Sequence, residues 1–153
     1  MEPGTAPFDR SRDCGLLARR LEQFQRRIAE RHEVASHGLV HESLAEGDLL
    51  ASRTLLEGII ERPVTGLRRA RMEATPHEDI SKAGYVYNAS EHPVWIPGRY
   101  NNRRDPRQPY RSGSLLNIPA SCTPRLRLPL FWLAFRHYPR RLFQRCALRT
   151  LQH

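Results

Sequence analysis

The chain has 153 residues, of which 39% are hydrophobic, and a formal net charge of +9 at pH 7. This length allows one domain with a hydrophobic core, but a complete eight-fold α/β barrel typically needs about 250 residues. The charge could suit nucleic acid, yet Lys82 is the only lysine among 25 basic residues. The arginines are spread from Arg10 to Arg149. This distribution favours a compositional preference for arginine, and we expect no nucleic-acid partner.

Cysteine usage and the apolar segments indicate the cellular setting. Cys14, Cys122 and Cys146 are far apart and form no CxxC pair, which excludes a zinc knuckle and a disulfide framework. A reducing compartment is therefore expected, and the N-terminus has no apolar stretch of a signal peptide. The longest apolar run, residues 128–135, is too short to span a bilayer, which takes about 20 residues in a helix. We expect no transmembrane segment and a cytoplasmic location.

Hydrophobic periodicity predicts helices and strands in alternation behind an irregular segment at residues 1–14. The expected helices are 14–30, 41–61, 75–84 and, interrupted at Pro139, 129–151. The expected strands are 32–37, 62–70, 85–90 and 114–121. Residues 91–113 hold four prolines and are expected to form a long loop, a kind of segment that often carries function on an α/β scaffold.

The helix expected at residues 75–84 has the clearest end signals. Thr75 is the expected N-cap, Pro76 takes the first helical position and Glu78 the capping-box position. Gly84 is the expected C-cap glycine. The alternation of helix and strand as a whole predicts an α/β fold, with parallel strands and outer helices.

Residues 32–41 read HEVASHGLVH and hold three histidines. His37 falls at the carboxyl end of an expected strand, where ligand sites of parallel α/β folds gather. His41 lies four residues later and would share a face with His37 if a helical turn begins there. Imidazole suits Zn²⁺ and similar divalent ions, but two surface histidines are an equally good interpretation. His32 is interpreted as structural.

The same stretch resembles the second motif of the polysaccharide deacetylase family, the NodB homology domain, in which a histidine pair follows a strand. PVTGLRRARM at residues 63–72 resembles the next motif, with Gly66, Leu67 and Arg68 matching and Ala70 replacing its proline. The segments AGYVYNAS, WIPGRYNN and IPASCTPRLRLPLFWLAF are similar to later family segments. The resemblance covers about residues 15–153, which would be a partial domain of this type.

The resemblance implies an incomplete distorted (β/α) barrel and a divalent metal, usually Zn²⁺, with His37 and His41 as ligands. It also implies hydrolysis of acetyl groups from a carbohydrate substrate, with Arg68 orienting the catalytic carboxylate. Trp95, Arg99 and Tyr100 would border the sugar groove, although plain packing is an equal interpretation for Trp95. An incomplete barrel would leave sheet edges exposed, and these invite self-association.

Two further motifs of the family are not recognisable in this sequence. The upstream aspartate pair, which would supply the base and the third metal ligand, has only Asp9 as a substitute, without the strand and partner expected around it. The downstream histidine acid is not recognisable either, and His153 stands out of context. The resemblance therefore predicts a deacetylase-like protein with impaired hydrolysis, as a truncated gene product or a fragment of a longer chain. A non-catalytic carbohydrate-binding or interaction remnant is the alternative.

Overall fold

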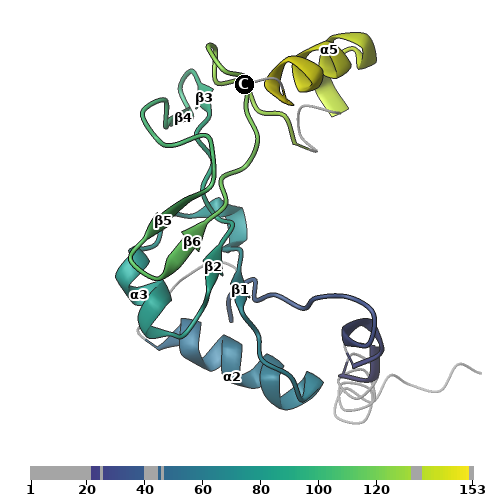
Figure 1. Cartoon of the computed structure of the whole chain (residues 1–153), viewed down its shortest axis with the longest axis vertical. Coiled ribbons are helices and arrows are strands. Elements are labelled where there is room, and N and C mark those ends of the chain that lie inside the picture. The colour runs from purple at the N-terminus through teal and green to yellow at the C-terminus, as the bar shows by residue number, and fades with distance from the viewer. Residues whose placement is uncertain (1–21, 25, 40–44, 46, 132–135, 152–153) are drawn as a thin grey trace, which may run out of the picture.

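The computed structural model describes residues 22–24, 26–39, 45, 47–131 and 136–151 (Figure 1). The irregular segment predicted at residues 1–14 lies outside these ranges, and so does His41. Residues 22–24 and 26–29 are helical, in agreement with the first predicted helix.

A four-stranded sheet forms the centre of the fold. Its strand order is β1 (Gly66–Leu67), β2 (Tyr87–Asn88), β6 (Leu115–Asn117) and β5 (Tyr110–Ser112). β2 pairs in parallel with both β1 and β6, whereas β5 and β6 are antiparallel. A separate antiparallel pair, β3 (Trp95–Ile96) and β4 (Tyr100–Asn101), lies beyond one end of this sheet (Figure 1).

The strands differ from the sequence-based expectation in two places. The strand predicted at 32–37 is reduced to one parallel bridge between Ser36 and Leu67, closed by hydrogen bonds from Ser36 N to Gly66 O and from Arg68 N to Ser36 O. The prediction of an uninterrupted loop at 91–113 was wrong, because β3, β4 and β5 lie within it. β5 turns into β6 at Gly113, whose positive φ of 60° suits glycine.

α2 (Asp48–Ile60) and α3 (His77–Lys82) begin later than predicted, whereas the last helix is interrupted at Pro139 as expected. α2 starts only after Gly47, with Asp48 Oδ2 accepting a hydrogen bond from Ala45 N. α5 (Arg140–Leu151) begins directly after Pro139, as its predicted interruption implies. In α3 the N-cap is Pro76, without a side-chain hydrogen bond.

The capping prediction for α3 was therefore wrong. Thr75 Oγ1 contacts the carbonyl of Glu73 at 3.5 Å and does not bond to a backbone N–H of the helix. Gly84 does end the helix as predicted, in the left-handed conformation with φ of 82°. In the turn before α3, the Thr75 hydroxyl bonds to the neighbouring Glu73 carbonyl and not to the helix N-terminus, so the expected capping box does not form.

The hydrophobic core lies between the sheet and helices α2 and α3. Val64, Leu67, Ile80 and Leu115 are fully buried within it. Tyr85 extends the core toward α2, where its hydroxyl donates a hydrogen bond to Leu49 O at 2.9 Å. Packing of this apolar face holds the short strands in register, since two or three paired residues alone would be marginal.

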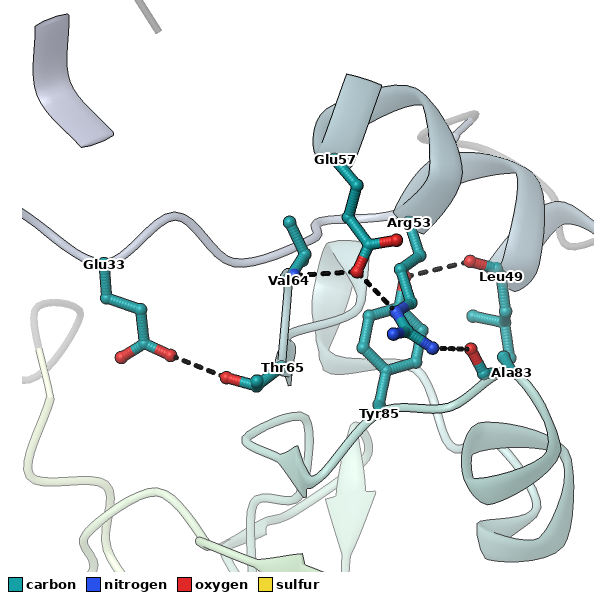
Figure 2. A network of polar contacts seen from close by, with 8 residues as sticks. All are labelled: Glu33, Leu49, Arg53, Glu57, Val64, Thr65, Ala83 and Tyr85. Carbon is teal, nitrogen blue, oxygen red and sulfur yellow. Dashed lines mark hydrogen bonds and ion pairs between the residues drawn. The ribbon is translucent and has the colours of Figure 1, made fainter. Parts of the chain in front are cut away.

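A polar network fastens α2 to the segment before β1 (Figure 2). Glu57 Oε1 accepts hydrogen bonds from Val64 N at 2.9 Å and from Arg53 Nε at 3.0 Å. Arg53 Nη1 in turn donates to Ala83 O, at the end of α3. One carboxylate thus links two helices and the entry to the first strand.

We expect replacement of Glu57 by glutamine to weaken the fold at neutral pH and to matter less in acid. The backbone N–H of Val64 lowers the pKa of Glu57 below its ordinary value of 4.5, with help from Arg53 against an opposing effect of burial. A lowered folded-state pKa stabilises the fold above that ordinary value, and the contribution is lost as pH falls through the folded-state pKa. Urea unfolding at several pH values should show the two proteins converging in acid. Exposed Glu30→Gln is the control, and a difference that stays constant with pH would contradict the assignment.

The predicted fold class is supported at the level of a mixed α/β fold with a parallel sheet and helices. In the described part of the chain the sheet is open: β5 forms one edge, and beyond β1 only the single bridge to Ser36 follows. Self-association through these edges stays a prediction, which sedimentation at micromolar concentration would measure. No helix among the described residues is long and apolar enough to cross a membrane.

Candidate functional site

The parallel strands bring several polar residues to one edge of the sheet. His37 follows the bridge at Ser36, Arg68 follows β1, and Glu91 lies three residues beyond β2. Because these segments run in the same direction, their carboxyl ends meet at the edge where ligands of α/β folds bind. The candidate site is built from these chain segments and from the loop that carries β3 and β4.

A cavity of about 450 Å³, here called the arginine cavity, opens at this edge. Four of the predicted site residues line it together: His37, Arg68, Arg99 and Tyr100. The remaining lining residues are Arg69, Arg71, Met72, His92, Val94, Ile96 and Phe131. The structure thus places side chains from four separate chain segments around one cavity, and the roles of these residues stay predictions.

The imidazole of His37 is oriented by the backbone. Its Nδ1 lies 2.5 Å from the carbonyl oxygen of Arg68. Because a carbonyl oxygen only accepts, Nδ1 carries the proton, and the neutral ring then has its lone pair on Nε2. This is the tautomer that a ligand to a metal through Nε2 requires.

Among the described residues, Arg68 forms no ion pair with a carboxylate of the kind that the family resemblance predicts. Its Nη2 lies 3.7 Å from Met72 Sδ. The guanidinium is exposed at the arginine cavity. The orienting role of Arg68 therefore has no target within the described ranges.

The loop residues divide into two groups. Tyr100 lies edge-on against His92, with ring centroids 4.7 Å apart, and Arg99 lies over the ring of Tyr100. Burial lowers the pKa of His92, which favours its neutral form. Trp95 does not line the arginine cavity. Together with Arg99 and Tyr100 it lines a separate, more open cavity of about 350 Å³. The guanidinium of Arg103 stacks over the Trp95 ring at 4.8 Å, so one ring face is already covered.

A second cavity of about 290 Å³, here called the acidic cavity, shares Met72 and His92 with the first. Glu91 Oε1 accepts hydrogen bonds from Tyr110 OH and His77 Nε2, both at 2.7 Å. Burial, together with the bond to Glu91, raises the pKa of Tyr110 and keeps its hydroxyl protonated. Sequence analysis missed this cluster, although Glu91 follows a predicted strand and could have been found by that position.

The described residues do not by themselves fit a metal ion. They contain no cluster of three or more histidine, cysteine, aspartate or glutamate side chains that could bind one. The lining of the arginine cavity supplies the imidazoles of His37 and His92 and four guanidinium groups. The positive charge of the guanidinium groups disfavours a divalent cation unless other residues add negative charge. Zinc binding remains a proposal that depends on His41 and on other residues outside the described ranges.

We expect weak Zn²⁺ binding that is further weakened in His37→Ala and in His41→Ala, because each change would leave a single imidazole of the pair. Calorimetric titration of zinc into the unmodified chain and the two variants measures this directly. His137→Ala, which removes an exposed histidine near α5, is the control. Equal affinities of the unmodified chain and His41→Ala would remove the histidine pair as a metal site.

Comparisons with known proteins support the fold class. No protein-family model matches the chain, and no curated protein matches it. Among solved structures, a protein from Mycobacterium smegmatis assigned as a polysaccharide deacetylase superposes with a TM-score of 0.52 at 27% identity, over 68% of this chain and 37% of that chain. The Puue allantoinase superposes with a TM-score of 0.48 at 18% identity, over 68% of this chain and 35% of that chain.

The likeness to the Mycobacterium smegmatis structure indicates the class to which this chain is similar: α/β proteins with a polysaccharide-deacetylase-like fold. The chain spans only about a third of the length of the structures it resembles. At this identity and coverage the likeness supports a hydrolase-like fold, and the activity of the whole domain is a matter for proposal.

Proposed function

We propose that this chain binds an acetylated carbohydrate in the arginine cavity, as part of a polysaccharide-deacetylase-like domain. The observation that carries the proposal is the convergence of His37, Arg68, Arg99 and Tyr100 on one cavity at the carboxyl edge of the parallel strands. Sites at this edge serve ligands in α/β folds generally. The similarity to a protein assigned as a polysaccharide deacetylase supports a carbohydrate as the ligand class.

The lining of the cavity suits a sugar that is held from two sides. Ile96 and Phe131 supply apolar surface, and Tyr100 adds an aromatic ring with a hydroxyl. Apolar and aromatic surface beside polar groups that fix the orientation of a ligand is typical of small-molecule sites. The arginine side chains can donate hydrogen bonds to sugar hydroxyl and acetyl oxygens.

Hydrolysis needs more than binding, and the described lining of the arginine cavity supplies only part of it, the imidazoles of His37 and His92. A deacetylase must activate water and protonate a leaving amine, which takes a base and an acid in reach of the acetyl group. No described carboxylate lines the arginine cavity. Deacetylation by this chain alone is therefore proposed to be impaired, and metal-dependent chemistry would need His41 together with residues beyond those described.

Binding of N-acetylated chito-oligosaccharides tests the proposal. We expect measurable affinity by calorimetry, reduced roughly threefold to tenfold in Tyr100→Ala because the ring and hydroxyl leave the cavity wall. Tyr138→Ala, a tyrosine outside the lining of the arginine cavity, should bind as the unmodified chain does. Absence of binding, or an equal loss in both variants, would contradict a sugar site at this cavity.

A further inference from the structure

The two neighbouring cavities carry opposite charge. The arginine cavity is lined by four arginines and, among the described residues, by no carboxylate. The acidic cavity is lined by Glu73, Glu91 and Asp105 and by no arginine or lysine of the described chain. Surface arginines scattered by composition alone would not produce this separation, since the two cavities adjoin at Met72 and His92.

Arg69 is the unusual member of the arginine cavity. Its side chain is only 1% exposed, and a single guanidinium nitrogen, Nη2, forms an ion pair with Glu73 at 2.9 Å. Its Nε and Nη1 are buried without a hydrogen-bond partner. A buried charged donor without an acceptor is costly, so such a group needs an explanation.

The backbone holds Arg69 and its neighbours in place. Arg69 N donates to the hydroxyl of Ser90 at 2.9 Å, which fixes the chain beside β2. The short 3-10 turn η1 (Ala70–Met72) follows, and Arg71 and Met72 have positive φ values of 56° and 54°. Non-glycine residues in this region are strained and persist where the surroundings enforce them. The turn orders the segment that carries Arg71 to the same cavity as Arg69.

We infer that the arginine cavity binds an anionic group, a carboxylate or a phosphate, carried by the carbohydrate ligand. The planar guanidinium fork matches both groups and can bind either through two parallel hydrogen bonds. The exposed guanidinium groups of Arg71 and Arg99 can donate hydrogen bonds to such a group, while buried Arg69, with two unpaired nitrogens, adds positive charge within the wall of the cavity. The sugar part of this inference rests on the proposed function, whereas the anion site does not.

Direct binding of simple anions tests the inference. The probes are inorganic phosphate, glucuronate and, as the neutral counterpart, glucose, titrated calorimetrically at constant ionic strength because salt screens exposed charges. We expect phosphate or glucuronate to bind and glucose to bind more weakly. Preference for glucuronate would identify a carboxylate source, and preference for phosphate a phosphorylated one. Binding of neither anion would overturn the inference.

Variants locate the site. Arg71→Gln and Arg99→Gln alter exposed side chains and should fold, and each should weaken anion binding roughly tenfold or more. Arg141→Gln makes the same charge change on α5, which lies away from the four-stranded sheet, and should bind normally (Figure 1). An equal loss in all three variants would mean that only net charge matters, and the site would be wrong.

A stability measurement covers the buried residue. Phosphate should raise the melting temperature of the unmodified chain, because a ligand that binds only the folded state stabilises it. Phosphate should not raise the melting temperature of Arg69→Met. Without phosphate this variant can melt at the same or a higher temperature than the unmodified chain, because the substitution removes a buried, incompletely paired charge. A rise that persists in Arg69→Met would contradict the inference.

The outcomes separate the two proposals. Affinity for neutral N-acetylated chito-oligosaccharides without affinity for either anion would overturn the anion site and leave the proposed function in place. Affinity for anions without affinity for any saccharide would support the anion site and overturn the proposed function.

Discussion

Replacement of Leu67 by alanine should destabilise the fold by about 2–5 kcal/mol, a large share of the 5–15 kcal/mol typical of a domain. Leu67 is fully buried on β1 and belongs to the same core as Val64, Ile80 and Leu115. Truncation would remove apolar surface and leave a cavity that the surrounding short strands could not fill without losing register. Urea unfolding followed by circular dichroism measures the change.

The matched control for Leu67 is Leu55→Ala on α2, a leucine that is 56% exposed. Its loss should change stability by no more than about 0.5 kcal/mol, as is usual for surface substitutions. Equal destabilisation by both changes would mean that the buried layer around β1 does not hold the fold together.

Leu67 also connects stability to the candidate site. It pairs with Ser36 through the parallel bridge and with Asn88 of β2, and Arg68 follows it directly. The hydrogen bond from Arg68 N to Ser36 O and the contact of His37 with Arg68 O both depend on this pairing. A small displacement of β1 would therefore move His37 and Arg68 together, and binding should decline along with stability.

Burial explains which elements could be predicted from the sequence. The segments that contain β1, β2 and β6 hold apolar residues that pack in the core, and their patterns stood out. β5 was missed because its residues are partly exposed and the segment before it holds prolines. The cap of α3 was misplaced because Thr75 bonds locally to Glu73, a choice that depends on the preceding turn.

The candidate site likewise has residues that could be predicted from the sequence and residues that could not. His37 could be singled out because it lies at the carboxyl end of an expected strand, where ligand sites of parallel α/β folds gather, whereas Arg68 was assigned only through the family resemblance. The convergence of Arg69, Arg71 and His92 could not be predicted, because it depends on the strained turn at residues 70–72 and on the course of the loop after β2. Sequence patterns carry no signal for a buried guanidinium that keeps two nitrogens without partners.

The second large expected effect concerns acetate release, which should differ between this chain and a chimaera that extends it. The 153-residue chain should release no acetate above background from N-acetylated chito-oligosaccharides, even with added zinc. A general acid or base typically contributes about 10²–10⁴-fold to a reaction rate, and the described lining of the arginine cavity offers imidazoles but no carboxylate to act as the base. An enzymatic assay for acetate over long incubation measures this.

A chimaeric protein tests whether added segments give this chain deacetylase activity. Joining this chain to the segments of the Mycobacterium smegmatis protein that lie outside the shared region should restore acetate release, because those segments would supply the base, the third metal ligand and the acid that the family resemblance implies. His37→Ala in the chimaera should abolish the activity, whereas His137→Ala should leave it unchanged. Acetate release by the unmodified chain, lost in Asp9→Asn, would instead assign the base to Asp9 and show that the hydrolytic groups lie within residues 1–153.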